Sequence, residues 1–264
     1  RLNRTLIKKE DSLLKKLNVP VLVLALGAVG PAASAAASAA EDLTIVFKVT
    51  GPGEDRGATQ YFTPTRVRFD QGDEATVVNF ADGRVLNISM KKKQYSETTF
   101  AEIEQAMTTV SAEMEKAMAG IPEGLRNKMM GDASKEVTVT KGETRTIAGV
   151  ACQNYTVALS EKTRMETCVA ASLVPPFDPK NFKNLTLVSA PIGRGNSGIS
   201  KMVQKLREIE GVSLASSTSL SMMGKKIETA TEATEVRKGP IDASVFDVPP
   251  GFKKVDSPFA KMAR

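Results

Sequence analysis

The sequence predicts an α+β fold in which an antiparallel β-meander is interrupted by two amphipathic helices. Short segments with alternating apolar residues follow one another at hairpin spacing from residue 43 onward. Two stripes of apolar residues at steps of three and four begin at Phe100 and at Ile199. The β-segments form consecutive hairpins instead of repeated βαβ units, so the sheet is expected to be antiparallel.

Residues 1–40 have the order of a secretory signal peptide. Six basic residues precede the apolar run NVPVLVLALGAVG, and a small-residue tract, PAASAAASAA, follows it. We expect cleavage near Ala39 or Ala40 and export to the periplasm of a single domain formed by residues 41–264. The alternative is an uncleaved membrane anchor, but the run from Val19 to Val29 is shorter than the roughly 20 apolar residues that cross a bilayer.

Charge and composition exclude several functions. The formal net charge is +6, but residues 1–40 hold six Lys/Arg and two Asp/Glu, so the mature chain carries only +2. Lys91–Lys93 therefore indicates a solvated turn and no nucleic-acid partner. The chain has no histidine, which excludes serine–histidine and cysteine–histidine catalytic pairs and histidine-ligated zinc. We expect a protein that is not an enzyme and has no metal or cofactor; an enzyme using carboxylates, Tyr95 or Tyr155 is a third reading.

The mature chain is expected to open with a run of short strands. LTIVFKV at residues 43–49 is the first, and RVRFD, TVVNF and RVLNISM follow it. Gln71-Gly72-Asp73 and Ala81-Asp82-Gly83 separate them, and glycine supplies the positive φ that tight hairpin turns require. KQYSE at residues 93–97 adds a further strand after the lysine turn.

A helix of about 20 residues is expected to begin at the capping box formed by Thr99 and Glu102 and to end at Gly120. Its apolar residues recur on one face and form the candidate ligand-binding stripe: Phe100, Ile103, Met107, Val110, Met114 and Met118. Such a stripe has two interpretations, a permanently packed core or a contact surface for an apolar ligand. Methionine adapts to irregular apolar shapes, which suits the second.

The remaining segments complete the predicted meander. EVTVT and ETRTIA precede the cysteine hairpin, and the proline-rich stretch Phe177–Pro191 is expected to be an irregular connection. A second amphipathic helix then carries Ile199, Met202, Val203, Leu206 and Ile209. Two long strands, VSLASSTSLSM and KKIETATEATEV, close the chain, and the tail is predicted to be a strand end docked by Phe246.

The segment Gly193–Gly198 matches the dinucleotide-binding pattern G-x-G-x-x-G and follows the strand-like stretch NLTLVSAPI. We interpret it as a loop that leads into a helix. Its neighbours are antiparallel hairpins, and the next strand has no acidic residue to bind a ribose.

The two cysteines lie on neighbouring strands of one predicted hairpin. With Ser160 at the centre of the turn, Cys152 and Cys168 are each eight residues away and face one another, on the more polar side of the hairpin. Such a pair in an oxidising compartment favours a disulfide. Redox chemistry is the weaker alternative because the C-x-x-C spacing is absent, and metal binding is weaker because no histidine accompanies the thiols.

At this hairpin the sequence resembles the bacterial family called domain of unknown function 4412. A glycine-containing turn leads into Ile147 and Gly149, and Cys152 is followed three residues later by Tyr155. Two further stretches agree, VVNFADGRVLNISMKKKQYSE and RKGPIDASVFDVPPGFKKV. The resemblance covers most of residues 43–256, although this chain has Cys168 near a position where members often have tryptophan. It implies a fold like that of the periplasmic lipoprotein carriers (LolA/LolB-like), a strongly curved antiparallel sheet that forms an incomplete barrel covered by helices.

Two functions follow as expectations. The first is a periplasmic protein that binds or carries a hydrophobic or lipid-like ligand in the concavity of the sheet, against the stripe that begins at Phe100. The second is an envelope structural or protein-interaction module whose interior is filled and which binds another envelope protein. A concave face that these side chains fill completely, with no cavity of about 300 Å³ or more, would reject the first.

Overall fold

A computed structural model describes residues 41–51, 56–124, 135–160, 163–189, 198–222, 225–257 and 259. Within these ranges, the side chains of Met114, Ala117, Met118, Thr186, Ser189, Ile199 and residues 220–222 and 225–227 are outside the description. The predicted leader and its cleavage site lie outside the described residues, and export stays a prediction. None of the helices in the described part is long and apolar enough to cross a membrane.

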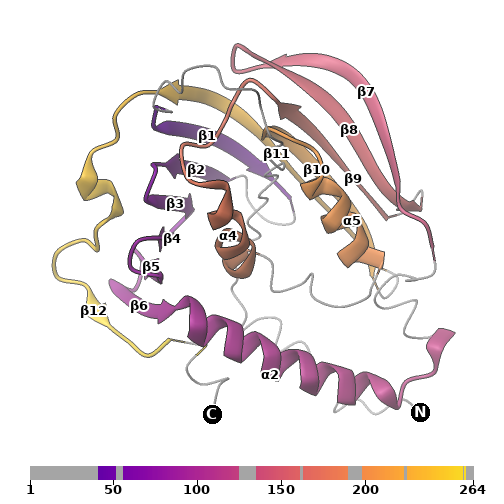
Figure 1. Cartoon of the computed structure of the whole chain (residues 1–264), viewed down its shortest axis with the longest axis horizontal. Coiled ribbons are helices and arrows are strands. Elements are labelled where there is room, and N and C mark those ends of the chain that lie inside the picture. The colour runs from indigo at the N-terminus through magenta and orange to yellow at the C-terminus, as the bar shows by residue number, and fades with distance from the viewer. Residues whose placement is uncertain are drawn as a thin grey trace.

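The strands form one large curved sheet that does not close on itself (Figure 1). The strand order is β12-β6-β5-β4-β3-β2-β1-β11-β10-β9-β8-β7, and every pairing is antiparallel except that of β12 with β6. The predicted curved antiparallel sheet of an α+β fold is thereby confirmed. The strands are β1 Leu43–Thr50, β2 Arg56–Phe62, β3 Arg66–Gln71, β4 Glu74–Asn79, β5 Arg84–Ser89, β6 Gln94–Thr99, β7 Thr138–Ile147, β8 Val150–Ser160, β9 Thr163–Ala170, β10 Val212–Met222, β11 Lys225–Lys238 and β12 Lys253–Lys254.

The predicted meander corresponds to β3–β6, and its turns form where glycine was expected. Gly72 and Gly83 have φ values of 58° and 61°, a region that side chains disfavour. The lysine turn after β5 is also a turn in the structure. At the middle of the sheet, β1 pairs with β2 on one side and with β11 on the other, so the first strand lies beside one of the last.

The two predicted helices correspond to α2 Phe100–Ala119 and α5 Gly198–Arg207. The structure adds α4 Phe182–Ser189 between them, so the predicted cover of two helices is incomplete. α4 lies in the stretch that was predicted to be irregular. Residues 184–189, the first six of the strand-like NLTLVSAPI, belong to this helix. The prolines misled the prediction: Asp178 and Pro179 cap and open a short 3₁₀ helix, η1 Pro179–Asn181, which leads directly into α4.

The main core lies between the sheet and the segment that leads into α4. Phe177 is 3% exposed and contacts the rings of Phe62, Phe80 and Phe182, with centroids 6.2, 5.3 and 5.1 Å away. Leu185 of α4 is buried in the same cluster. The expected loop therefore supplies the centre of the core, and burial of its aromatic rings is a main source of stability.

The opposite face of β3–β6 is covered by the C-terminal segment. Phe246, in η2 Ala243–Phe246, is buried in a cluster with Ala75, Val77 and Ile88. The guanidinium of Arg66 lies 4.8 Å from the centre of the Phe246 ring. Docking by Phe246 agrees with the prediction, although the residue lies in a 3₁₀ helix and not at a strand end.

Candidate functional site

The helix α2 begins at the predicted capping box. The backbone N–H of Thr99 donates to Glu102 Oε2 at 2.8 Å, and the backbone N–H of Glu102 donates to Thr99 Oγ1 at 3.2 Å. Hydrogen bonds from the backbone N–H and the hydroxyl of Thr99 to the Glu102 carboxylate hold its pKa below the ordinary value. Since β6 ends at Thr99, the box fixes the direction in which α2 leaves the sheet.

The first half of the candidate ligand-binding stripe is packed into a small core. Ile103 is fully buried and Met107 is 6% exposed, and both belong to a cluster with Val85 of β5 and Leu187 of α4. Phe100 is half-buried and contacts this cluster and the main core. Figure 1 shows α2 along the open side of the curved sheet, with α4 between the helix and the strands.

The second half of α2 has a different environment. Val110 is half-buried, and Ala112, Glu113, Glu115, Lys116 and Ala119 are exposed. The predictions for Met114 and Met118 fall on side chains outside the description. A ligand-binding role for the six-residue stripe stays a prediction. Among its described side chains, Ile103 and Met107 are buried and Phe100 and Val110 are half-buried.

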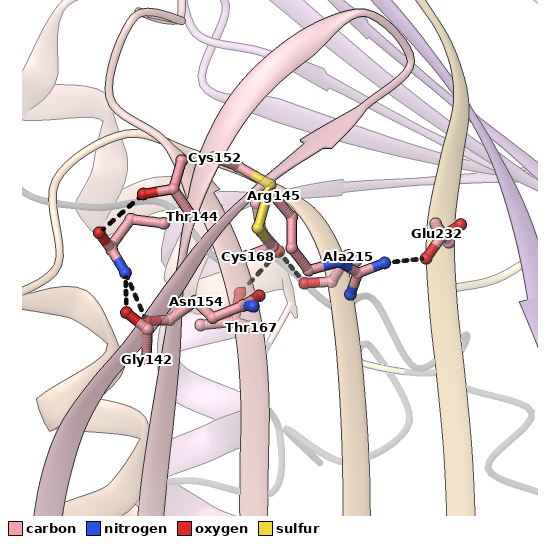
Figure 2. The surroundings of a disulfide bond; sticks show 11 residues. Gly142, Thr144, Arg145, Cys152, Asn154, Thr167, Cys168, Ala215 and Glu232 are labelled. Carbon is pink, nitrogen blue, oxygen red and sulfur yellow. Dashed lines mark hydrogen bonds and ion pairs between the residues drawn. A yellow bond between two sulfur atoms is a disulfide. The ribbon is translucent and has the colours of Figure 1, made fainter.

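The predicted disulfide is present between β8 and β9 (Figure 2). Cys152 and Cys168 have Cα atoms 5.3 Å apart and are 2% and 1% exposed. The predicted register is wrong by two residues, because Asn154 lies opposite Cys168 and the disulfide runs diagonally. A bulge between Ala158 and Ser160 shifts the pairing near the turn.

The cysteines share a strand face with Arg164 and Glu166, as predicted, but they lie at its buried end. Alternation along β8 places Val157 and Leu159 on one face, where they pack with Met202 of α5. It places Cys152 on the other face, yet both cysteines belong to the main core cluster. One face of the hairpin is therefore covered by α5, and the other is buried at the disulfide but exposed at Arg164 and Glu166.

Polar groups surround the disulfide at the edge of this core. Arg145 of β7 reaches Glu232 of β11, with Nη2 and Oε2 3.1 Å apart, although β8, β9 and β10 separate the two strands (Figure 2). On β9 and β10 the hydroxyls of Thr167 and Ser213 lie 2.8 Å apart and are buried. The sheet must curl strongly here for Arg145 to reach across β8, β9 and β10 to β11. The disulfide links β8 and β9 within this curled region.

A shallow polar trough lies beside this region, over β1, β9, β10 and β11. Its volume is about 260 Å³, and its lining includes Thr50, Arg164, Glu166, Ser217 and Ser219. Arg164 Nε and Glu166 Oε1 are 3.3 Å apart and both side chains are half-exposed. The trough is smaller and far more polar than the apolar cavity that the ligand hypothesis requires, so it does not test that hypothesis.

Two carboxylates of the β3–β6 region have shifted pKa values of opposite sign. Hydrogen bonds from Lys254 and Arg84 lower the pKa of Glu97. Burial raises the pKa of Asp70, although Arg68 Nε donates to Asp70 Oδ1 at 2.6 Å. Arg68 also donates to the carbonyl of Val245, and Glu97 joins β6 to β12 through Lys254. These groups attach the C-terminal segment to the sheet.

Sequence reasoning missed α4 and the ion pair between Arg145 and Glu232 beside the disulfide. The spacing of Phe182, Leu185 and Val188 was a usable helical signal for α4, hidden by the prolines that precede it. No signal in one sequence could pair Arg145 with Glu232, because that contact depends on the curl of the sheet. Among the described residues no group of three or more cysteine and acidic side chains could hold a metal ion.

Comparisons with solved structures found distant likenesses. An uncharacterized conserved protein from Thermus thermophilus is 8% identical with a TM-score of 0.43, covering 83% of this chain and 91% of that chain. The MucA/MucB complex of Pseudomonas aeruginosa is 9% identical with a TM-score of 0.40, covering 79% and 56%. A LolA superfamily protein from Nitrosomonas europaea is 4% identical with a TM-score of 0.24, covering 79% and 90%. At these TM-scores the likenesses carry no inference about ligand or role.

No curated protein sequence matches the chain. The model of one protein family matches the chain. The match extends from β1 to the segment just before β12 and includes the meander, α2, the disulfide hairpin and the closing strands. It agrees with the resemblance that the hairpin sequence indicated. With residues 45–252 matched, the chain belongs to the family described as Domain of unknown function (DUF4412).

Proposed function

We propose that the protein is a non-enzymatic, exported protein that binds a hydrophobic, lipid-like ligand against the apolar stripe of α2. One observation supports the proposal: Ile103 and Met107 of the stripe are packed in a core cluster, whereas Val110, further along the helix, is only half-buried. Ile103 and Met107 already have packing partners in Val85 and Leu187. From Val110 onward the helix has exposed neighbours on its other faces, and its apolar positions continue at helical spacing.

The ligand contacts therefore come from the second half of the stripe. Val110 is half-buried, and Met114 and Met118 continue its face in the sequence. An unbranched thioether side chain conforms to differently shaped apolar groups, which suits an acyl chain of variable length. Phe100, Ile103 and Met107 act as the fixed base of the helix and hold the ligand-facing half in place.

Export is supported by the leader sequence and by the disulfide. Cys152 and Cys168 are both nearly inaccessible, so their disulfide has no exposed sulfur for a reductant to attack. A buried structural disulfide is typical of proteins that fold in an oxidising compartment. The non-enzymatic assignment rests on the sequence, whose lack of histidine excludes the commonest catalytic groups.

An envelope protein-interaction module is the second candidate, and the edge strand β7 favours it. β7 ends the sheet, and its residues Thr138–Thr146 are exposed along the whole strand. An edge strand presents unpaired backbone groups that can accept an extended segment of another protein. Under this candidate the stripe of α2 is core only and no ligand is bound.

The test is binding of cis-parinaric acid, a fluorescent fatty acid, to the mature protein purified from a bacterial periplasm. We expect saturable binding, and the substitution Val110→Lys should weaken it at least tenfold because a charge would face the acyl chain. Thr109→Lys is the matched control, since it adds the same charge one residue away at an exposed position.

Circular dichroism establishes that both variants are folded before they are compared. Equal binding by the Val110→Lys and Thr109→Lys proteins would remove the stripe from the site. Absence of binding to the unsubstituted protein would reject the ligand hypothesis and favour the interaction module.

A further inference from the structure

We propose that the protein docks on anionic phospholipid surfaces through a lysine patch at the β12 edge of the sheet. The lysine patch consists of Lys91, Lys92, Lys93, Lys253 and Val255. This inference is independent of the proposed ligand site, because it concerns a surface at the other end of β6 from the start of α2.

The fold creates the patch from two distant parts of the sequence. Lys91–Lys93 form the turn between β5 and β6, and Lys253 lies on β12. The backbone N–H of Lys253 donates to the carbonyl of Lys93 at 3.0 Å, and that of Val255 donates to the carbonyl of Tyr95 at 2.8 Å. Figure 1 shows β12 beside β6 at one end of the sheet. In the sequence, the lysine turn alone gave no reason to expect a partner. In the fold, β12 brings Lys253 and Val255 beside this turn.

The four lysine side chains of the patch are exposed and unneutralised. No described side chain forms an ion pair with Lys91, Lys92, Lys93 or Lys253. The neighbouring Lys254 differs, because its Nζ lies 2.5 Å from Glu97 Oε2. Two carboxylates stand at the adjacent turn, Asp73 and Glu74, and Glu74 accepts a hydrogen bond from Ser89. Asp256, next to Val255, is also exposed, so the four lysines exceed these three carboxylates by one charge.

An exposed apolar side chain within the patch selects the partner. Val255 is 40% exposed and is one of three large hydrophobic residues exposed among those described. A hydrated anionic polymer offers it no apolar contact, whereas the boundary of a bilayer accepts apolar groups beside cations. Lysine without arginine also suits a diffuse layer of headgroups better than one stereospecific phosphate. Each lysine near an anionic bilayer strengthens binding by about fivefold.

The experiment is cosedimentation of the mature protein with vesicles of phosphatidylglycerol and phosphatidylcholine, and with vesicles of phosphatidylcholine alone. We expect binding to the anionic vesicles that falls as salt is raised. The triple substitution Lys91→Gln, Lys92→Gln and Lys253→Gln should weaken this binding by roughly tenfold to hundredfold. The matched control replaces Lys135, Lys141 and Lys238, which are exposed elsewhere, with glutamine.

Val255→Ser should weaken binding a few-fold, and Val174→Ser, at a more exposed site outside the patch, should not. Equal losses in the two triple variants would assign the effect to net charge and overturn the patch. Binding to isolated cell-wall polymer but not to vesicles would overturn the choice of partner. Parinaric acid binding is measured in parallel: its retention by the patch variant shows that a loss of vesicle binding leaves the proposed function intact.

Discussion

The two halves of the sheet are stabilised in different ways. In β3–β6 both faces are buried, one by the main core and α2, the other by the C-terminal segment with Phe246. In β8–β11 one face packs under α5, while the other carries the polar trough and, near its end, the buried disulfide. A half that is covered on both faces is held by apolar packing. The other half has less cover and contains the one covalent cross-link of the chain.

The largest loss of stability is expected where the C-terminal segment covers β3–β6. Phe246→Ala removes a ring that is 2% exposed and leaves a cavity against Ala75, Val77 and Ile88. We expect the free energy of unfolding to fall by about 3–5 kcal/mol in denaturant titrations. Val174→Ala, at a residue that is 58% exposed, should change it by less than about 0.5 kcal/mol. Similar losses in the two variants would mean that the C-terminal segment does not support the sheet.

The disulfide provides the corresponding test in the second half. Replacing Cys152 and Cys168 with alanine opens a loop whose ends are 16 residues apart, and we expect a loss of about 3 kcal/mol. Amide hydrogen exchange should accelerate in β8 and β9 while β4 and β5 keep their protection. Uniform acceleration across the sheet would contradict the division into two halves.

A smaller effect is expected at the junction of α2 with the first half. Thr99→Ala removes the hydroxyl that accepts from the Glu102 N–H and donates to Glu102 Oε2, and should cost about 1 kcal/mol. Thr108→Ala is the control, because Thr108 lies in the same helix and bonds only within it, to the carbonyl of Glu104. A larger loss in the Thr108 variant would show that the capping box does not anchor the helix.

The smallest effect is a dependence of stability on pH. Since ion pairs lower the pKa of folded Glu97, its contribution is present above its ordinary pKa of 4.5 and is lost as the pH falls through the lower folded value. Asp70 has the opposite sign, because burial raises its pKa and its contribution is lost as the pH rises through the folded value. Thermal unfolding of Glu97→Gln should therefore be less sensitive to acid than that of the parent protein. Equal sensitivity would exclude Glu97 as a source of the acid response.

Local signals predicted most elements of both halves, but not how the elements of the second half pair. The meander, its glycine turns and the whole of α2 follow from periodicity, turn residues and the pair Thr99–Glu102, which act within a few residues. The register of the cysteine hairpin depends on the bulge near Ala158, and the contact of Arg145 with Glu232 depends on the curl of the sheet. Neither quantity is encoded in a short stretch of sequence.

The candidate site shows the same limit. The apolar stripe follows from helical spacing, but the packing of Ile103 and Met107 could not be predicted, because it depends on Leu187 in α4, which the preceding prolines hid. The lysine patch likewise needed the pairing of β12 with β6. In both places a sequence-distant segment decides the environment of a local motif.

The most direct measurement is native mass spectrometry of the mature protein purified from a bacterial periplasm, followed by denaturation and lipid extraction. A bound, extractable lipid that is present on the parent and Thr109→Lys proteins and absent from Val110→Lys is the predicted result. A mass equal to the bare chain less the two hydrogens lost in the disulfide, unchanged after incubation with mixed lipids, would contradict it. In that case the stripe of α2 is core along its whole length, and the edge strand β7 becomes the surface to investigate.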